Sequence, residues 1–250
     1  MSADSSKPAG LGKPWLVVLA TLLIFFLSQF FAALFVGIGY QITNPGASLT
    51  TALTQSAPVQ FSYILLAEIL AIGLVILLVK KIKKVGLGAI GLGRRPVWRD
   101  VGRALLGAGA FYLLLIAASI LISIFMPSFR VDEPQDIGFS ALNSSFDYLL
   151  AFAALVLLPP LGEETLMRGY LYSGLRAYWR FVPAMLLTSL LFGAAHLSSG
   201  TGDTPLWAAG IDTFLLSLVL VYMRERSGAL YAGILLHAMN NGIAFTIHFN

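Results

Sequence analysis

The sequence predicts an all-α fold, a polytopic bundle of about seven (six to eight) membrane-spanning helices. Of its 250 residues, 58% are hydrophobic and only 11% are charged, and the mean hydropathy is +0.83. Soluble domains carry about 25% charged residues. The apolar residues also gather in runs long enough for helices that cross roughly 30 Å of hydrocarbon. The chain has no cysteine, which excludes a thiolate nucleophile, a Cys-ligated zinc and any disulfide.

Apolar runs bounded by charged or turn residues mark the expected helices. They lie near residues 15–40, 59–79, 104–126, 147–176, 182–198, 206–223 and 229–247. We expect the fourth to be broken at Pro159-Pro160, because each proline removes a backbone donor whose bond other groups must restore in a membrane. The first run exceeds 20 residues and no A-x-A-like cleavage site follows it, so a retained helix is expected rather than a signal peptide.

The basic residues predict how the bundle is oriented in the cell membrane. With seven helices, 15 of the 16 Lys and Arg residues fall on one side, and Arg130 falls on the other. The positive-inside rule then places a tail of residues 1–14 in the cytoplasm and Asn250 outside, with residues 15–250 as the membrane domain. A basic connector follows the second helix, and we expect it to lie against anionic lipid headgroups. Its members are Lys80, Lys81, Lys83, Lys84, Arg94, Arg95, Arg99 and Arg103. This connector accounts for the net charge of +4 without nucleic acid as a partner.

Two short motifs are interpreted as ordinary turns. Gly86–Gly91 fits G-x-G-x-x-G, but it lacks the strand and the βαβ context of a dinucleotide site. Gly200–Asp203 resembles the GxGD signature of aspartyl intramembrane proteases, yet it lies in a loop rich in Ser, Gly and Pro, where Gly and Asp are common turn residues. Neither a G-x-S-x-G elbow nor an H-E-x-x-H pair occurs, so serine-hydrolase and zincin arrangements have no support.

A set of polar residues in the apolar second half is the candidate functional site. Ionisable side chains inside membrane helices are costly and usually face a cavity. Measured from the turn at 178–180, Glu163 and His196 both lie roughly 20 Å along their helices. From the turn at Ser227, His237 lies about 14 Å and Asn241 about 20 Å along the last helix. Three helices are therefore expected to present these groups at one level.

The spacing within each helix agrees with this arrangement. Residues four apart share a helix face, which relates Glu164 to Arg168, Phe192 to His196 and His237 to Asn241. Glu164 and Arg168 can then neutralise each other, as a buried pair must. Glu163 lies about 100° further round the helix and can point elsewhere.

In order, these residues match the motifs EExxxR, FxxxH and HxxxN/D. The last 100 or so residues therefore resemble the CPBP superfamily, which includes CAAX prenyl endopeptidases of the Rce1 type and bacterial Abi proteins. The resemblance implies an intramembrane endopeptidase with a catalytic core near residues 145–247. It implies that Glu163 is the general base, helped by His196, and that His237 and Asn241 stabilise the oxyanion. Glu164, Arg168 and Phe192 would support them.

The same resemblance leaves the cofactor and the substrate open. We favour a mechanism without a cofactor; if zinc is present, Glu163, His196 and His237 are the expected ligands. The expected substrate is a membrane-associated peptide or a lipidated, prenylated or CAAX-like protein that reaches the site from the cytoplasmic side.

Two other functional classes remain alternatives. A proton-coupled transporter would use Glu68, Asp212, Glu163 and the histidines as a relay. A non-catalytic bacteriocin-immunity or scaffold protein would bind a partner through the same cavity.

Overall fold

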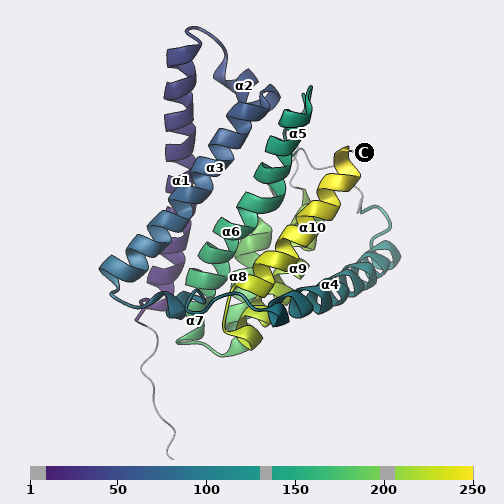
Figure 1. The fold of residues 1–250 in the computed structure, drawn as a ribbon. Coiled ribbons are helices and arrows are strands. Elements are labelled where there is room, and N and C mark those ends of the chain that lie inside the picture. The colour runs from purple at the N-terminus through teal and green to yellow at the C-terminus, as the bar shows by residue number, and fades with distance from the viewer. Residues whose placement is uncertain (1–9, 130–136, 198–205, 250) are drawn as a thin grey trace, which may run out of the picture.

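The structure, a computed structural model, describes residues 10–129, 137–197 and 206–249, and these residues form helices and turns without strands. Each apolar run of the sequence forms a helical rod, and the rods pack into a bundle (Figure 1). The longer helices are α1 (Pro14–Thr43), α3 (Ala57–Leu77), α4 (Trp98–Phe125), α8 (Phe181–Ala195), α9 (Trp207–Ser227) and α10 (Tyr231–Phe249), and a short α2 (Leu49–Gln55) precedes α3. The polytopic helical bundle predicted from composition is thereby confirmed.

Among the described residues, five helical rods are long and apolar enough to cross a membrane. They are Pro14–Thr43, Ala57–Ile82, Trp98–Phe125, Ser145–Arg176 and Trp207–Ser227. Of the other two expected spans, α8 has 15 residues, which gives about 22 Å of helix, less than the roughly 30 Å of hydrocarbon. It ends at Ala195 rather than near residue 198, because the N–H of His196 bonds the carbonyl of Gly193 in a tighter final turn. The other expected span, α10, has 19 residues, and it carries His237 and Asn241 of the candidate site.

The fourth rod is continuous through its two prolines, which differs from the expected break. Its α-helical parts are α5 (Ser145–Phe152), α6 (Leu158–Glu164) and α7 (Ser173–Arg176), and π-helical segments at Ala153–Leu157 and Thr165–Tyr172 join them. The helix changes its hydrogen-bonding register at the prolines instead of stopping. Such π segments are rare and often occur at functional sites.

Hydrogen bonding explains why no interruption is needed. The carbonyl of Leu155 would accept from residue 159 in an α-helix or from residue 160 in a π-helix, and both are prolines without an N–H. The side-chain amide of Asn241, from α10, donates to this carbonyl at 3.0 Å. A neighbouring helix thus supplies the donor that the prolines remove, as lipid-embedded backbone requires.

The packing of the helices separates a lipid-facing half from a polar half. In the first half, α1 packs against α3 and exposes aromatic side chains such as Phe26 and Phe30. Helix α4 leaves the bundle at a steep angle (Figure 1) and touches mainly α9 and α10. In the second half, α8 packs closely on α9, and α6 lies between α3 and α10. The polar residues of the second half are therefore enclosed by helices on several sides.

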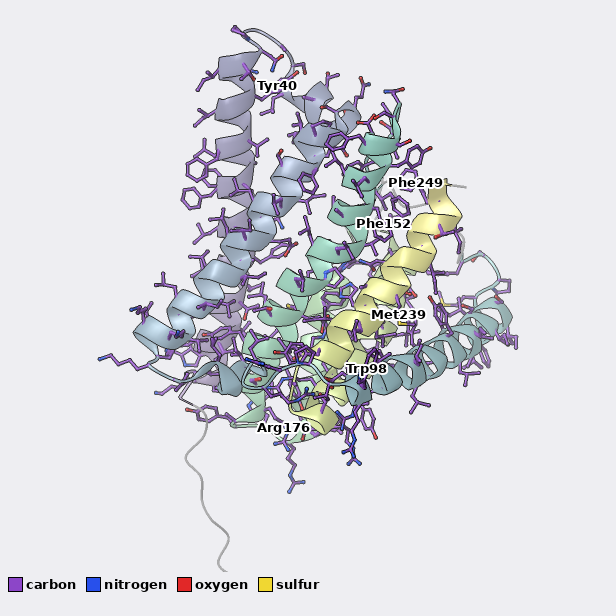
Figure 2. All side chains as sticks on the ribbon, viewed as in Figure 1. Tyr40, Trp98, Phe152, Arg176, Met239 and Phe249 are labelled. Atoms are coloured by element: carbon purple, nitrogen blue, oxygen red, sulfur yellow. The ribbon has the colours of Figure 1, made fainter. Side chains whose placement is uncertain are left out.

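The basic segments meet at one end of the bundle. The N–H of Leu230 bonds the carbonyl of Gly91 at 3.2 Å, and the hydroxyl of Tyr231 bonds the carbonyl of Arg94 at 2.5 Å. Arg176 pairs with Glu225 at 3.0 Å. Figure 2 shows Trp98 and Arg176 toward this end, and Tyr40 and Phe249 toward the opposite one. The connector 83–97 and the ends of α7 and α9 thus form one basic face.

Of the two short motifs interpreted as turns, the structure describes only the first. Gly86–Gly91 forms a single 3-10 turn over Leu87–Ile90, and Gly91 follows it with φ +82°. The turn packs on the fourth rod, since a Cβ on Gly169 would lie 3.1 Å from the carbonyl oxygen of Ile90. Gly200–Asp203 and Arg130 lie outside the described residues.

Candidate functional site

The end of α6 holds two consecutive carboxylates in different environments. Glu164 is 1% exposed, and its Oε1 lies 2.8 Å from Nη1 of Arg168, which is itself fully buried. The spacing of four residues predicts this ion pair. The side chain of Glu163 is 28% exposed. One carboxylate is therefore neutralised inside the protein, and the other belongs to a partly exposed side chain.

His237 of α10 lies between the two carboxylates. Its Nδ1 is 3.1 Å from Oε1 of Glu164, and its Nε2 is 3.8 Å from Oε2 of Glu163. A carboxylate paired with Arg168 can only accept, so Nδ1 of His237 is the donor. A Cβ on Gly233, one turn earlier in α10, would lie 3.2 Å from Oε2 of Glu164. A small residue at this point lets α10 approach the buried ion pair.

The ring of Phe192 in α8 contacts several residues of the candidate site. The guanidinium carbon of Arg168 lies 4.2 Å from the centre of its ring. The ring centre is 4.7 Å from that of His196 and 5.8 Å from that of His237, which it meets edge to face. A cation over an aromatic face is attracted by the ring quadrupole. Phe192 thus contacts one residue from each of the three motifs.

His196 caps the C-terminus of α8 and is half-buried. Its Nδ1 lies 2.8 Å from the carbonyl oxygen of Phe192, one turn earlier. Because a carbonyl oxygen only accepts, Nδ1 carries the proton, and the lone pair of the neutral ring is on Nε2. Nε2 is therefore the ring nitrogen that can act as an acceptor.

Asn241 lies one turn beyond His237 and bonds the carbonyl of Leu155 through Nδ2. This bond uses one of the two N–H groups of the amide. The second N–H is the group with which Asn241 can meet an oxyanion. Asn241 thus joins the proline segment of the fourth rod to the helix that carries His237.

Two further acidic residues of the membrane helices adjoin the site. A Cβ on Gly162 would overlap the carboxylate of Glu68 from α3, and Glu68 interacts electrostatically with Glu163. Asp212 of α9 interacts electrostatically with His196. Neither belongs to the three motifs. The glycine directly before the glutamate pair is the signal that could have placed Glu68 here, because small residues mark close helix contacts in membranes.

The zinc alternative has little support from the geometry. Within the described ranges, no group of three or more His, Cys, Asp or Glu residues is arranged to hold a metal ion. Of the three expected ligands, His196 and His237 both contact Phe192, and Glu163 lies near His237; they do not form such a group. We therefore derive no step through a metal.

The contacts link three of the four residues that the depth argument grouped, Glu163, His196 and His237, whereas the side-chain hydrogen bond of Asn241 is to Leu155. Glu163, Glu164 and Arg168 lie around His237, and His196 joins them through Phe192. The expectation of one shared level is met by residues up to 73 positions apart. Their catalytic roles stay predictions.

Comparison with known proteins identifies the segment that carries this site. The family model "Type II CAAX prenyl endopeptidase Rce1-like" matches residues 145–243. An uncharacterized 24.3 kDa protein of Escherichia coli is 31% identical over 134 residues, which are 52% of this chain and 59% of that protein. The aligned region thus covers less than two thirds of that relative. No solved structure matches the chain significantly. The matched segment holds all three motifs, so the family model agrees with the resemblance that these motifs carry.

Proposed function

We propose that this protein is an intramembrane endopeptidase in which Glu163 activates a water molecule to hydrolyse a peptide bond. The observation that carries the proposal is the unequal environment of the glutamate pair. Arg168 and His237 hold Glu164 inside the protein, while Glu163 is 28% exposed. Within the described part of the chain, its Oε2 is enclosed and has no hydrogen-bond partner. A general base needs a carboxylate that hydrogen bonds do not already hold, and this describes Glu163 better than Glu164.

The neighbouring residues support a complete hydrolytic cycle. Glu163 takes a proton from water as the oxygen attacks the scissile carbonyl, and the carbonyl π electrons become the oxyanion. His237, with Nδ1 held by Glu164, donates from Nε2 to this oxyanion when it is protonated, and Asn241 donates from its amide. His196, which contacts Phe192, assists Glu163 in transferring protons. Breakdown of the intermediate expels the amine, which takes a proton and leaves a carboxylic acid product.

The substrate that we propose is a peptide segment of a membrane-associated or lipidated protein, including a prenylated or CAAX-like one. The basic face formed by the connector 83–97 and the ends of α7 and α9 supports a cytoplasmic N-terminus by the positive-inside rule. Anionic headgroups are its expected partners. We therefore infer that substrate enters from the cytoplasmic side.

A cleavage assay tests the function. Wild-type protein is reconstituted in vesicles with a peptide library and compared with Glu163→Gln and His196→Ala. We expect both variants to fold and to lose cleavage by about 10² or more, as removal of a catalytic acid or base does. The matched control is Glu225→Gln, the same change at a partly exposed carboxylate of the basic face, and it should cleave normally.

Other outcomes separate the alternatives. Normal cleavage by Glu163→Gln overturns the role of this residue. Proton flux without cleavage identifies a transporter, and a partner retained equally by all variants without cleavage identifies a scaffold. Activity that a chelator abolishes and zinc restores overturns the mechanism without a cofactor.

A further inference from the structure

The segment between α4 and α5 places an aromatic side chain inside the bundle. In the described part of this segment, residues 137–144, the side chain of Phe139 is only 2% exposed. It belongs to an apolar cluster with Ala57 of α3 and Ala154 of the fourth rod, and Phe245 of α10 packs against this cluster. The ring of Phe139 therefore lies among α3, the fourth rod and α10, of which the last two carry residues of the candidate site.

The backbone at this point has a conformation that L-residues rarely adopt. Phe139 has φ +55°, in the left-handed region, and Gly138 before it has φ +74°. Left-handed backbone is costly for a bulky residue and persists only where its surroundings impose it. Gln60 of α3 supplies this support, because its side chain is buried and its Oε1 accepts the N–H of Phe139 at 2.7 Å. A Cβ on Gly138 would overlap this oxygen. Gln60 and Gly138 thus hold Phe139 within the bundle.

The position of this cluster relative to the site follows from the helix rise. Leu155 packs against the cluster and precedes Glu163 by eight residues, and Phe245 follows His237 by eight. Both helices therefore place the cluster about 12 Å from the site. It lies toward the end opposite the basic face, where Figure 2 shows Phe249, another residue packed against the cluster. The cluster is thus between that end of the bundle and the site.

A hydrolytic site within a membrane needs water from one side and a barrier on the other. Under the proposed function, on which this inference rests, substrate and water reach Glu163 from the cytoplasmic side. A path that was wet at both ends would also conduct protons across the membrane. Apolar constrictions prevent such conduction in channels, because water leaves a narrow apolar passage. We propose that Phe139 is a seal that closes the site toward the end opposite the basic face.

Proton leak through vesicles tests the seal. Each variant is reconstituted in vesicles that hold a pH gradient, and an enclosed pH-sensitive dye reports the decay of the gradient. We expect Phe139→Ala to leak faster than wild-type protein, because the constriction loses its ring. Gly138→Ala should also leak, because its Cβ displaces the segment from Gln60.

The matched control for the leak is Phe111→Ala. This change removes an equally buried ring from the cluster of α4, α9 and α10, so the vesicles should hold their gradient as with wild-type protein. Equal leak in Phe139→Ala and Phe111→Ala overturns the proposal, and so does a gradient that Phe139→Ala leaves intact.

A second readout follows water rather than protons. The chain has no cysteine, so Ala154→Cys adds a single thiol to the cluster around Phe139, at a position that is 0% exposed. We expect a charged, membrane-impermeant thiosulfonate to leave this thiol unmodified, and to modify it when Phe139→Ala is also present. Combination with Phe111→Ala should leave it unmodified. A thiol that stays unmodified in both double variants overturns the seal. If wild-type protein cleaves no peptide while the thiol and the leak still depend on Phe139, the proposed function has failed and the seal has not.

Discussion

His237 and His196 both donate through Nδ1, but their acceptors are of different kinds. His237 is 5% exposed at its side chain, and it bonds Glu164, 73 residues earlier, which is paired in turn with Arg168. His196 bonds the backbone carbonyl of Phe192, four residues earlier, at the half-buried end of α8. The first imidazole is held by charges from another helix and the second by its own helix. If the proposed roles hold, the oxyanion donor is part of the core and the proton carrier lies at its edge.

The largest effect is expected when the buried ion pair behind His237 is broken. Arg168→Met leaves Glu164 buried without its cation, and we expect it to lower the free energy of unfolding by about 3–5 kcal/mol. Unfolding in detergent measures this change. Arg176→Met is the matched control, because its ion pair with Glu225 is partly exposed and contributes about 0–1 kcal/mol. Equal losses in the two variants would contradict the buried charge network.

A smaller effect tests the ring that both histidines share. Phe192→Leu removes the aromatic face beneath Arg168, and we expect a loss of about 2 kcal/mol for the desolvated cation–π contact. Phe111→Leu is the control, since Phe111 is fully buried among apolar residues of α4, α9 and α10. Phe192→Leu should also change the NMR signals of both His196 and His237. A response of only one histidine would show that the two sides are independent.

The smallest effect is expected for Asn241, whose amide has a structural bond and a proposed catalytic one. Asn241→Ala leaves the carbonyl of Leu155 without a donor, which costs about 1 kcal/mol. Asn240→Ala, which removes the acceptor of Tyr112, is a control of similar size. If Asn241 also meets the oxyanion, its variant loses more cleavage activity than Asn240→Ala at equal stability. Equal activities would leave Asn241 with the structural role alone.

Local rules predicted much of this molecule. Helix positions follow from apolar runs, because a helix that crosses the hydrocarbon must be long and predominantly apolar. The Glu164–Arg168 pair and the shared level of the site follow from helix rise and from spacing on one face. The continuous helix at Pro159-Pro160 did not follow, because its missing donor comes from α10. Glu68 is a costly residue in an apolar helix, but its neighbours depend on a crossing at Gly162 that a single helix does not specify.

The bond between Asn241 and Leu155 has a consequence for the assembly of the protein. It spans 86 residues, and it completes the backbone of the rod that carries Glu163. During synthesis, the proline segment enters the bilayer before its donor exists, so that rod settles only after α10 has docked. His237 arrives on the same helix. A nascent chain without α10 therefore lacks both the donor to the Leu155 carbonyl and the His237 imidazole.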